Sequence, residues 1–318
     1  AADKARIPLA RMAHEETGMG VLEDKIIKNH FASEYIYNKH KNAKTCGIIK
    51  EDKANGIKVV AEPLGVIAGI VPTTNPTSTA IFKSLIALKT RNPIIFSFHP
   101  SAHESSKQAA IVIRDAAIAA GAPENCIQWL SIKSMYATNA LMNHPGIATI
   151  LATGGNAMVK AAYSCGKPAL GVGAGNVPAY VEKTCVLPRA VNDIVLSKSF
   201  DNGMICASEQ AAIVDQEIYS DFMKEIKRFH VYFVNKEEKV KLSRFMFGFA
   251  HGDENVETAK LNPNVVGKSA HWIAEQAGFE VPEDTVILAV ECDMVGPKEP
   301  MTREKLSPVL AILKSKDA

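Results

Sequence analysis

The sequence contains no C-x-x-C pair, although it has six cysteines among 318 residues. Paired cysteines of that spacing hold structural zinc, and dense cysteine frameworks mark small secreted domains, so neither class of protein is indicated. Long apolar runs are also missing, since none reaches the roughly 18 residues that a membrane-spanning helix needs. These absences favour a protein that works in a reducing cytoplasm.

An excess of charge of one sign is equally absent. Lys and Arg total 36 against 34 Asp and Glu, which gives a formal net charge of +2. This balance provides no electrostatic reason to expect nucleic acid or an anionic membrane as a partner. Hydrophobic residues make up 47% of the chain and charged residues 22%, as is typical of globular proteins, and the length allows two cores.

The N-terminal part of the chain changes from a helical to a strand-like pattern. Residues 7–40 repeat apolar side chains near the 3.6-residue period and are predicted to form two helices. Three β-rich runs follow, at residues 46–49, 57–61 and 66–71. The third run is apolar on both alternating faces, as expected for a strand buried in a parallel sheet. It leads through PTTNPTS into a helix predicted at residues 81–88, which Thr77 or Ser78 could cap.

From residue 94 onward, predicted strands alternate with predicted helices. The strands are expected at residues 94–97, 126–130 and 147–152. The helices are expected at residues 105–120, 134–142 and 157–165. This alternation predicts an α/β fold with a doubly wound parallel sheet, in which ligands bind at the carboxyl ends of the strands.

A second α/β domain is predicted beyond a boundary near Glu182, which gives domains of residues 1–182 and 183–318. A Gly-rich turn at residues 171–176 and a strand at residues 177–181 precede that boundary. The second domain alternates again. Its strands are expected at residues 211–214, 285–290 and 309–313, and its helices at residues 187–200, 217–229, 236–247 and 270–277.

Cys206 is the cysteine whose surroundings point to chemistry. The helix predicted before it stops at the Asp-Asn-Gly sequence of residues 201–203, and a strand is predicted to begin at Ala211. The thiol is therefore expected on a connection between elements, where it could meet a ligand and ionise. The alternative is a packing role, which is the commoner one for a single cysteine.

Two glycine-containing turns are candidate ligand sites. The stretch LATGGNA at residues 151–157 is predicted as a strand, a turn and a helix start, which presents backbone N–H groups to an anion. The stretch GVGAG at residues 171–175 is similar in composition but does not open a helix. Neither matches G-x-G-x-x-G, and tight packing turns explain both sequences equally well.

The remaining polar candidates are Asn75 and a pair of histidines. Asn75 follows a buried strand, where its side-chain amide could donate to an oxyanion or form an Asx turn before Pro76. His99 and His103 are four residues apart, but the sequence places no third ligand beside them. No metal site is therefore expected, since zinc needs three or four ligands.

Five motifs together resemble the aldehyde dehydrogenase superfamily in order and spacing: PTTNP at residues 72–76, TGG at 153–155, the stretch 171–178, FDNGMICASEQ at 200–210, and EKLSP at 304–308. Residues 29–35 and 71–92 are similar to the coenzyme-A-acylating half of bifunctional aldehyde–alcohol dehydrogenases. The resemblance covers almost the whole chain and is weakest at residues 245–264. It implies a Rossmann-type NAD-binding domain and a second, catalytic α/β domain.

The resemblance also implies roles for individual residues. Cys206 would be the nucleophile, and Asn75 with the Cys206 backbone N–H would form the oxyanion hole. Glu304 would hold the nicotinamide ribose of NAD. The other residues lining the NAD site would be Ile70, Val71, Pro72, Thr73, Thr74, Asn75, Gly155 and Gly173. The implied reaction is the reversible oxidation of acetaldehyde or another short aldehyde to acetyl-CoA through a thioester on Cys206, with coenzyme A as co-substrate.

Two positions depart from the wider superfamily. Hydrolytic members carry a glutamate base in a loop that resembles residues 171–176, and the matching residue here is Val172. Because valine accepts no proton, water should be a poor acyl acceptor and a thiol a better one. The superfamily's usual ribose-binding lysine is matched by Ser97, so the preference for NAD rests on the resemblance.

The resemblance further implies a fold that continues beyond residue 318, and we expect this chain to be a fragment whose full-length protein forms a homo-oligomer. Two other interpretations remain open. One is a hydrolytic aldehyde dehydrogenase that uses a different base. The other is an inactive piece that only binds NAD or a partner chain.

Overall fold

The computed structural model describes residues 1–316, which divide into two compact units. Unit 1 comprises Ala1–Gly18 and Leu22–Ala174, and unit 2 comprises Met19–Val21 and the chain from Gly175 onward. The division falls earlier than the predicted boundary near Glu182. The reason is that strand β8 (Val177–Val181) pairs with strand β9 (Glu209–Asp215) and so belongs to the second sheet.

Unit 1 contains a parallel sheet, as the sequence predicted, with four predicted strands and a fifth, β7 (Ala169–Val172). Its strands are β3 (Val66–Val71), β4 (Ile94–Phe98), β5 (Ile127–Trp129), β6 (Ile147–Thr153) and β7 (Ala169–Val172). Their order is β5-β4-β3-β6-β7, which is the doubly wound order with its reversal between β3 and β6. Strand β7 was not predicted, because its four residues had been interpreted as part of a Gly-rich turn.

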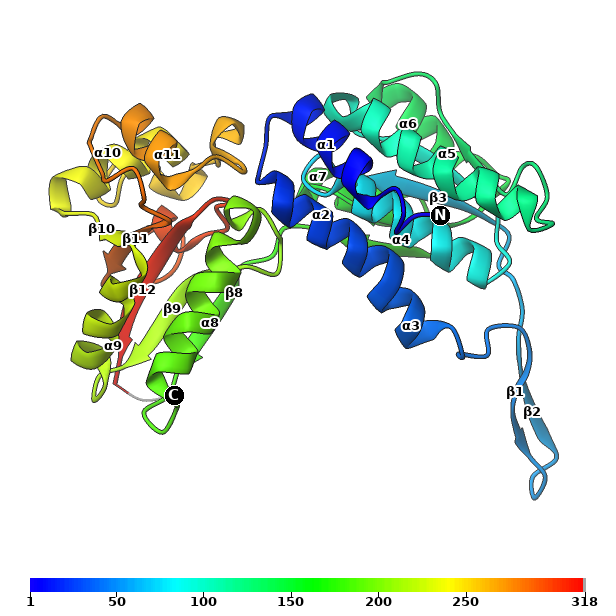
Figure 1. Ribbon diagram of the computed structural model, residues 1–318, viewed down its shortest axis with the longest axis horizontal. Helices are drawn as coiled ribbons and strands as arrows, with labels where there is room; N and C mark the ends of the chain where they lie inside the picture. The colour runs from blue at the N-terminus through cyan, green and yellow to red at the C-terminus, as the bar shows by residue number, and fades with distance from the viewer. Residues whose placement is uncertain (317–318) are drawn as a thin grey trace. The chain divides into compact units, whose positions relative to one another are not determined.

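Helices cover both faces of this sheet (Figure 1). Helices α4 (Pro76–Lys89) and α5 (His103–Ala119) pack on one face, with α1 (Arg6–Thr17) and α2 (Leu22–His30) outside them. Helices α6 (Met135–Asn143) and α7 (Asn156–Tyr163) pack on the other face. Phe96 is fully buried in the first core. Its ring lies where a side chain at Gly69 would be, since a Cβ there would stand 2.8 Å from Phe96 Cδ1.

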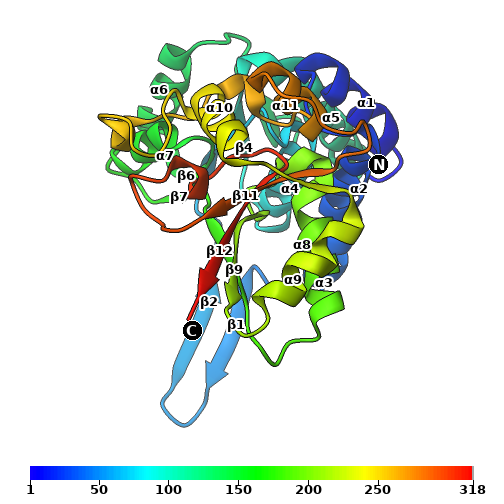
Figure 2. The same ribbon diagram turned by 90° about the vertical axis from the view of Figure 1, so that its left-hand side faces the viewer.

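Between α2 and the sheet, the chain forms a π-helical segment η1 (Phe31–Tyr35), helix α3 (Ile36–His40) and a hairpin of β1 (Gly47–Asp52) and β2 (Ile57–Ala61). The two hairpin strands are antiparallel and, among residues 1–316, pair only with each other. Figures 1 and 2 both show this ribbon separate from the five-stranded sheet. Apolar side chains on it are exposed, including Ile48 and Ile57.

Unit 2 has its own five-stranded parallel sheet. The strands besides β8 and β9 are β10 (Val231–Phe233), β11 (Ile287–Cys292) and β12 (Val309–Ser315). Their order is β10-β11-β12-β9-β8. Strand β10 was not predicted, because it is only three residues long and is recognisable as a strand only through its pairing with β11.

Helices also cover both faces of the second sheet. Helices α8 (Leu187–Ser199) and α9 (Tyr219–Ile226) pack on one face, and α10 (Lys236–Phe247) and α11 (Ala270–Ala277) on the other. Short helical turns complete the chain: η2 (Pro100–Ala102), η3 (Phe200–Gly203), η4 (Lys227–Phe229), η5 (Val256–Thr258), η6 (Pro263–Val265) and η7 (Pro300–Thr302). Within residues 1–316, no helix has the length and apolar character needed to cross a membrane.

Candidate active site

The turn after β3 lies at the reversal point of the first sheet. Ile70 pairs with Ala152 of β6, so the turn that holds Thr73 and Asn75 stands beside the turn that follows β6. The hydroxyl oxygen of Thr73 is buried and has no hydrogen-bond partner within residues 1–316. A buried polar atom without a partner is costly, which fits a position that receives a ligand.

Asn75 is the N-cap residue of α4, which begins at Pro76, earlier than the predicted start at Ile81. The prediction that Thr77 or Ser78 caps this helix is therefore wrong. The Asn75 side chain makes no capping hydrogen bond, and its Nδ2 donates to Thr74 Oγ1 at 3.1 Å. The amide keeps a second N–H for a ligand, as the oxyanion role requires.

Lys83 bonds to both strands at this edge of the sheet. Its Nζ donates to the carbonyl oxygens of Ile70 at 2.6 Å and of Leu151 at 2.7 Å. The two acceptors belong to β3 and β6, the strands on either side of the reversal point. Burial lowers the pKa of Lys83 to about 7. No sequence pattern had singled out this lysine.

The Gly155 and Gly173 turns lie together in unit 1. Gly155 is the N-cap residue of α7, and Gly154 N donates to Val172 O at 3.1 Å, which extends the pairing of β6 with β7. Asn156 links the two turns, because its Oδ1 accepts from Ala174 N at 3.0 Å. A Cβ at Gly173 would stand 2.9 Å from that same oxygen, so a larger residue there would have to displace the Asn156 side chain.

The turn before Cys206 has an unusual backbone. Asp201, Asn202 and Gly203 have φ of 50°, 53° and 66°, so three consecutive residues are left-handed. Asp201 is fully buried and its Oδ1 accepts from Val21 N at 2.7 Å, while Asn202 Nδ2 donates to Gly267 O at 3.0 Å. Strain of this kind persists only where surrounding contacts hold it. Cys206 follows this turn and is half-buried on the connection, as predicted.

We call residues 201–208, which include the left-handed backbone and Cys206, the Cys206 turn. Glu304 lies next to the Cys206 turn within unit 2. Its Oε1 accepts from Gly175 N at 2.9 Å. Gly175 in turn contacts the turn, since a Cβ there would stand 2.7 Å from Cys206 O. Burial raises the pKa of the Glu304 carboxyl, and the Gly175 N–H opposes part of that shift. One carboxylate oxygen is thus fixed by backbone, and the other remains available to a ligand.

Gly175, the Cys206 turn and Glu304 form one cluster. Its three segments lie at the amino ends of neighbouring strands. Gly175 precedes β8, Cys206 precedes β9 and Glu304 precedes β12, and these strands are adjacent in the order β12-β9-β8. The expectation that ligands bind at carboxyl ends describes unit 1, where the turns with Asn75 and Gly155 follow their strands. In unit 2 the candidate residues stand at the opposite ends. Each set is held together within its own unit.

Comparison with known proteins decides the family. The sequence matches the aldehyde dehydrogenase family over residues 4–234. The chain belongs to the aldehyde dehydrogenase family.

Relatives of this aldehyde dehydrogenase chain include the aldehyde-alcohol dehydrogenase of Streptococcus pneumoniae serotype 4, which is 67% identical over 307 residues, or 96% of this chain and 35% of that protein. The chain therefore spans about a third of the length of such curated relatives. An acetylating aldehyde dehydrogenase of Geobacillus thermoglucosidasius superposes with a TM-score of 0.93 at 47% identity, over 99% of this chain and 68% of that one. The propionaldehyde dehydrogenase of Rhodopseudomonas palustris, solved with bound propionyl-CoA, has a TM-score of 0.82 at 35% identity, over 97% and 66%.

The two positions that depart from the superfamily pattern have clear surroundings. Ser97 is buried, and its hydroxyl bonds to Thr138 Oγ1 at 2.7 Å, so its side chain serves the packing of α6 against β4. Val172 ends β7 with 52% of its surface exposed. It offers no proton acceptor, which leaves this aldehyde dehydrogenase chain without a base at that position.

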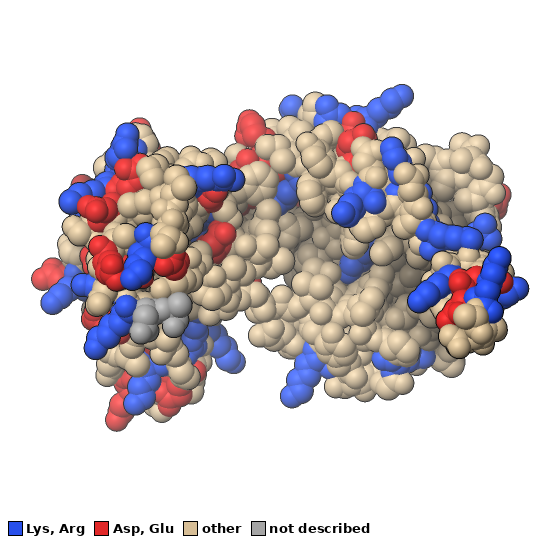
Figure 3. Space-filling view, turned by 90° about the horizontal axis from the view of Figure 1, so that it is seen from below, with Lys and Arg blue, Asp and Glu red and all other residues tan. Residues whose placement is uncertain are grey.

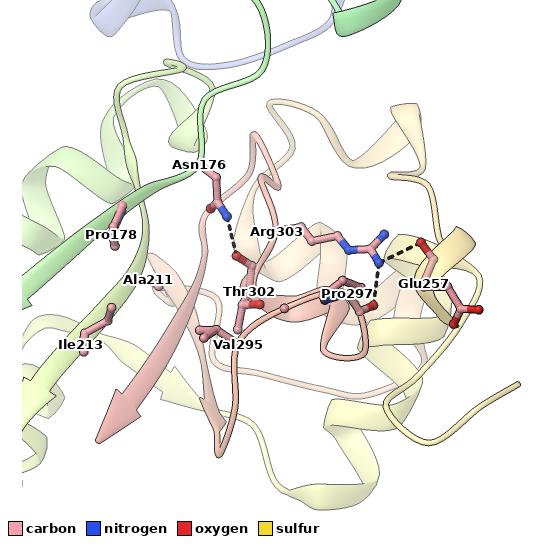
Figure 4. A pocket seen from close by; sticks show the side chains of 10 residues that line it. Asn176, Pro178, Ala211, Ile213, Glu257, Val295, Pro297, Thr302 and Arg303 are labelled. Atoms are coloured by element: carbon pink, nitrogen blue, oxygen red, sulfur yellow. Dashed lines mark hydrogen bonds between the residues drawn. The ribbon is translucent and has the colours of Figure 1, made fainter. Parts of the chain in front are cut away.

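Two surface features of this aldehyde dehydrogenase chain do not form part of the cluster. A pocket of about 470 Å³ in unit 2 is lined by Asn176, Ile213, Thr302 and Arg303 among others, but by neither Cys206 nor Glu304 (Figure 4). Its arginine is already engaged, since the guanidinium donates to the carbonyls of Val256, Glu257, Ala259 and Pro297. Charged side chains of both signs are interspersed on the face drawn in Figure 3, in keeping with the small net charge.

Proposed function

We propose that the protein containing this chain oxidises a short aldehyde to the corresponding acyl-CoA, with NAD as hydride acceptor. The observation that carries the proposal is the cluster in which Gly175 joins the Cys206 turn to Glu304. The absence of a base at Val172 favours a thiol over water as acyl acceptor. The bound propionyl-CoA of the Rhodopseudomonas relative and the acetylating activity named for the Geobacillus relative support coenzyme A as that thiol.

The residues of this chain fit a dinucleotide cofactor. The Thr73 hydroxyl, which has no partner in the part of the chain that the structure describes, and the Gly155 turn stand at the reversal point of the first sheet, where dinucleotides bind in doubly wound folds. We propose that residues 70–75, Gly155 and Gly173 line this site and that Glu304 accepts hydrogen bonds from the nicotinamide ribose. When bound, NAD supplies the acceptor for the hydride that leaves the aldehyde carbon.

The proposed reaction begins with the Cys206 thiolate, which attacks the aldehyde carbon and forms a C–S bond. The oxyanion that results accepts hydrogen bonds from the Asn75 amide and the Cys206 backbone N–H. Loss of hydride converts this adduct into a thioester on Cys206. The coenzyme A thiolate then attacks the thioester carbon, and the Cys206 thiolate leaves as acyl-CoA departs.

The first test follows NADH formation by the protein, purified from its complete open reading frame, with acetaldehyde and NAD. We expect NADH to form when coenzyme A is present and to fall to a small fraction of that rate without it, because water lacks a base. Acid product formed at the same rate without coenzyme A would establish a hydrolytic enzyme instead. Binding of NAD with no turnover in either condition would leave only a binding role.

Replacing Asn75 with alanine should lower kcat by about 10²- to 10³-fold, the usual effect of removing one oxyanion donor. The KM for NAD should change little, because Asn75 would contact the cofactor through backbone. Asn75→Asp is the matched variant, since it keeps the size of the side chain but donates no proton. We expect it to lose as much activity as Asn75→Ala; full activity in Asn75→Asp would show that the amide donor plays no part.

A further inference from the structure

Two lysines of unit 2, Lys198 and Lys305, are fully buried, and they differ in how they are bonded. Lys305 Nζ donates to three carbonyl oxygens, those of Gln210 at 2.9 Å, Met301 at 2.8 Å and Arg303 at 2.9 Å. An ammonium group has three protons, so its hydrogen-bonding capacity is filled. Within residues 1–316, Lys198 Nζ makes one hydrogen bond, to Gln210 Oε1 at 3.2 Å.

Gln210 is the residue that connects Lys305 to the Cys206 turn. It is fully buried near the start of β9, four residues after Cys206. Besides accepting from Lys305 Nζ through its backbone carbonyl, it accepts from Lys305 N through Oε1 at 3.0 Å. Its Nε2 donates to Ser208 O at 3.0 Å, which fixes the end of the turn. The turn and the segment that bears Glu304 are thereby joined by two bonds from one lysine.

The other acceptors of Lys305 lie on the approach to Glu304. Met301 belongs to η7, and Arg303 directly precedes Glu304. The Lys305 side chain therefore holds the backbone immediately before Glu304 in place. On the C-terminal side of Lys305, the backbone of Ser307 packs tightly against Gly203 of the Cys206 turn, since a Cβ at Gly203 would stand 2.5 Å from Ser307 O. The Glu304 segment is thus held against the turn on both sides of the carboxylate.

Charge pairing alone does not account for Lys305, although the nearby Glu299 and Glu304 carboxylates oppose part of the fall in its pKa. Its protons go to carbonyl oxygens, and Glu304 instead takes its hydrogen bond from Gly175 N. Burial lowers the pKa of Lys305 to about 7, and burial together with the nearby Lys305 charge holds the pKa of Lys198 well below its usual value. Burying an ammonium group disfavours its charged form, so we take the role of Lys305 to be the arrangement of backbone that its three hydrogen bonds fix.

We propose that Lys305 is a positioning residue, which fixes the Glu304 carboxylate relative to the Cys206 turn by binding Gln210, Met301 and Arg303 at once. The proposal rests on the proposed function only in giving Glu304 the ribose of NAD as its ligand. Lys305 itself touches neither substrate nor cofactor. Partners that orient metal ligands typically affect affinity or activity by roughly 10- to 100-fold, and we expect an effect of that order for a residue that orients Glu304.

The test compares Lys305→Met with Lys198→Met in the protein purified from its complete reading frame. Both substitutions remove a fully buried ammonium group and replace it with an unbranched side chain of similar length. Only the first removes the Nζ hydrogen bonds that tie the Glu304 segment to the carbonyl oxygens of Gln210, Met301 and Arg303. The measurements are the dissociation constant for NAD without aldehyde, kcat and KM with acetaldehyde and coenzyme A, and amide hydrogen exchange followed by mass spectrometry.

For Lys305→Met we expect the NAD dissociation constant to rise roughly 10-fold or more, with kcat lowered as well. Peptides covering residues 204–210 and 300–306 should lose exchange protection together, while strand β11 (Ile287–Cys292) keeps its protection. Lys198→Met should bind NAD within about twofold of the parent, because Gln210 Oε1 keeps the Lys305 N–H. The paired loss of protection is the signature that a general loss of stability would not produce.

Three results would overturn the proposal: equal effects of the two variants, loss of protection in β11 as well, or parental NAD binding by Lys305→Met. If Lys305→Met does not fold, Gln210→Leu removes the Oε1 contact but keeps the backbone carbonyl, and the same paired loss is expected. Failure of both to fold would assign Lys305 to stability alone. Should the parent make no coenzyme-A-dependent NADH, the exchange measurements still decide the role of Lys305 separately from the proposed reaction.

Discussion

The protein with Cys206 replaced by serine is expected to form NADH from acetaldehyde and coenzyme A more slowly than the parent by at least about 10⁴-fold, as for other enzymes that lose their nucleophile. A serine hydroxyl ionises far less readily than a thiol, and an oxygen ester would replace the thioester. The structure gives no base at Val172 that could assist the hydroxyl. NADH absorbance over a wide range of enzyme concentration measures the loss.

Cys185→Ser provides the control, because Cys185 is a second partly buried free thiol of unit 2 outside the Cys206 turn. This variant should keep activity within about twofold of the parent, because the change is conservative and lies away from the site. NAD binding should also survive in Cys206→Ser, which shows that the variant is folded. Coenzyme-A-dependent NADH persisting in Cys206→Ser would remove Cys206 from the reaction and with it the proposed mechanism.

Gly203→Ala is expected to destabilise unit 2 strongly, because the added methyl group has no room. The new Cβ would stand 2.5 Å from Ser307 O, 2.7 Å from Ser307 C and 2.9 Å from Lys198 O, all of them backbone atoms that move only with the chain. Overpacking costs about 1–3 kcal/mol and a left-handed non-glycine residue about 1–2 kcal/mol, so we expect a loss of about 2–5 kcal/mol in the free energy of unfolding. Urea unfolding followed by circular dichroism measures it.

Gly248 separates the two contributions. It ends α10 with φ of 77°, and a Cβ there would meet nothing within 4 Å. Gly248→Ala should therefore show only the backbone cost, about 1–2 kcal/mol. Equal losses in the two variants would mean that the Cys206 turn relaxes around the methyl group, and that its packing against Ser307 is not tight.

The alternation of strands and helices was predictable because buried parallel strands are apolar on both faces. Residues 66–71, for example, form β3 as expected. Strand β10 could not be predicted, because three residues carry no period and become a strand only by pairing with β11. The boundary near Glu182 was misplaced for a related reason: the local sequence of β8 does not reveal which sheet it joins.

The candidate site shows the same division between local and distant information. The connection that bears Cys206 was evident from the Asp-Asn-Gly stop before it and the strand after it. The bond from Gly175 N to Glu304 joins residues 129 positions apart, and that from Lys305 N to Gln210 joins residues 95 apart. Nothing local marks either pair, so family resemblance could suggest the role of Glu304 but could not suggest Lys305.

Cys206 and Glu304 lie at the amino ends of their strands, so the connections at the other end of the second sheet are separated from both side chains by the length of a strand. The connection from β9 to α9 is there, and Glu217 on it is exposed, with an ion pair to Lys183 at 2.7 Å. A fluorophore, an affinity tag or a cross-linking handle attached at Glu217 would stand a full strand length away from Cys206, the proposed nucleophile, along β9. A label at this position would therefore leave the surroundings of Cys206 within unit 2 unchanged.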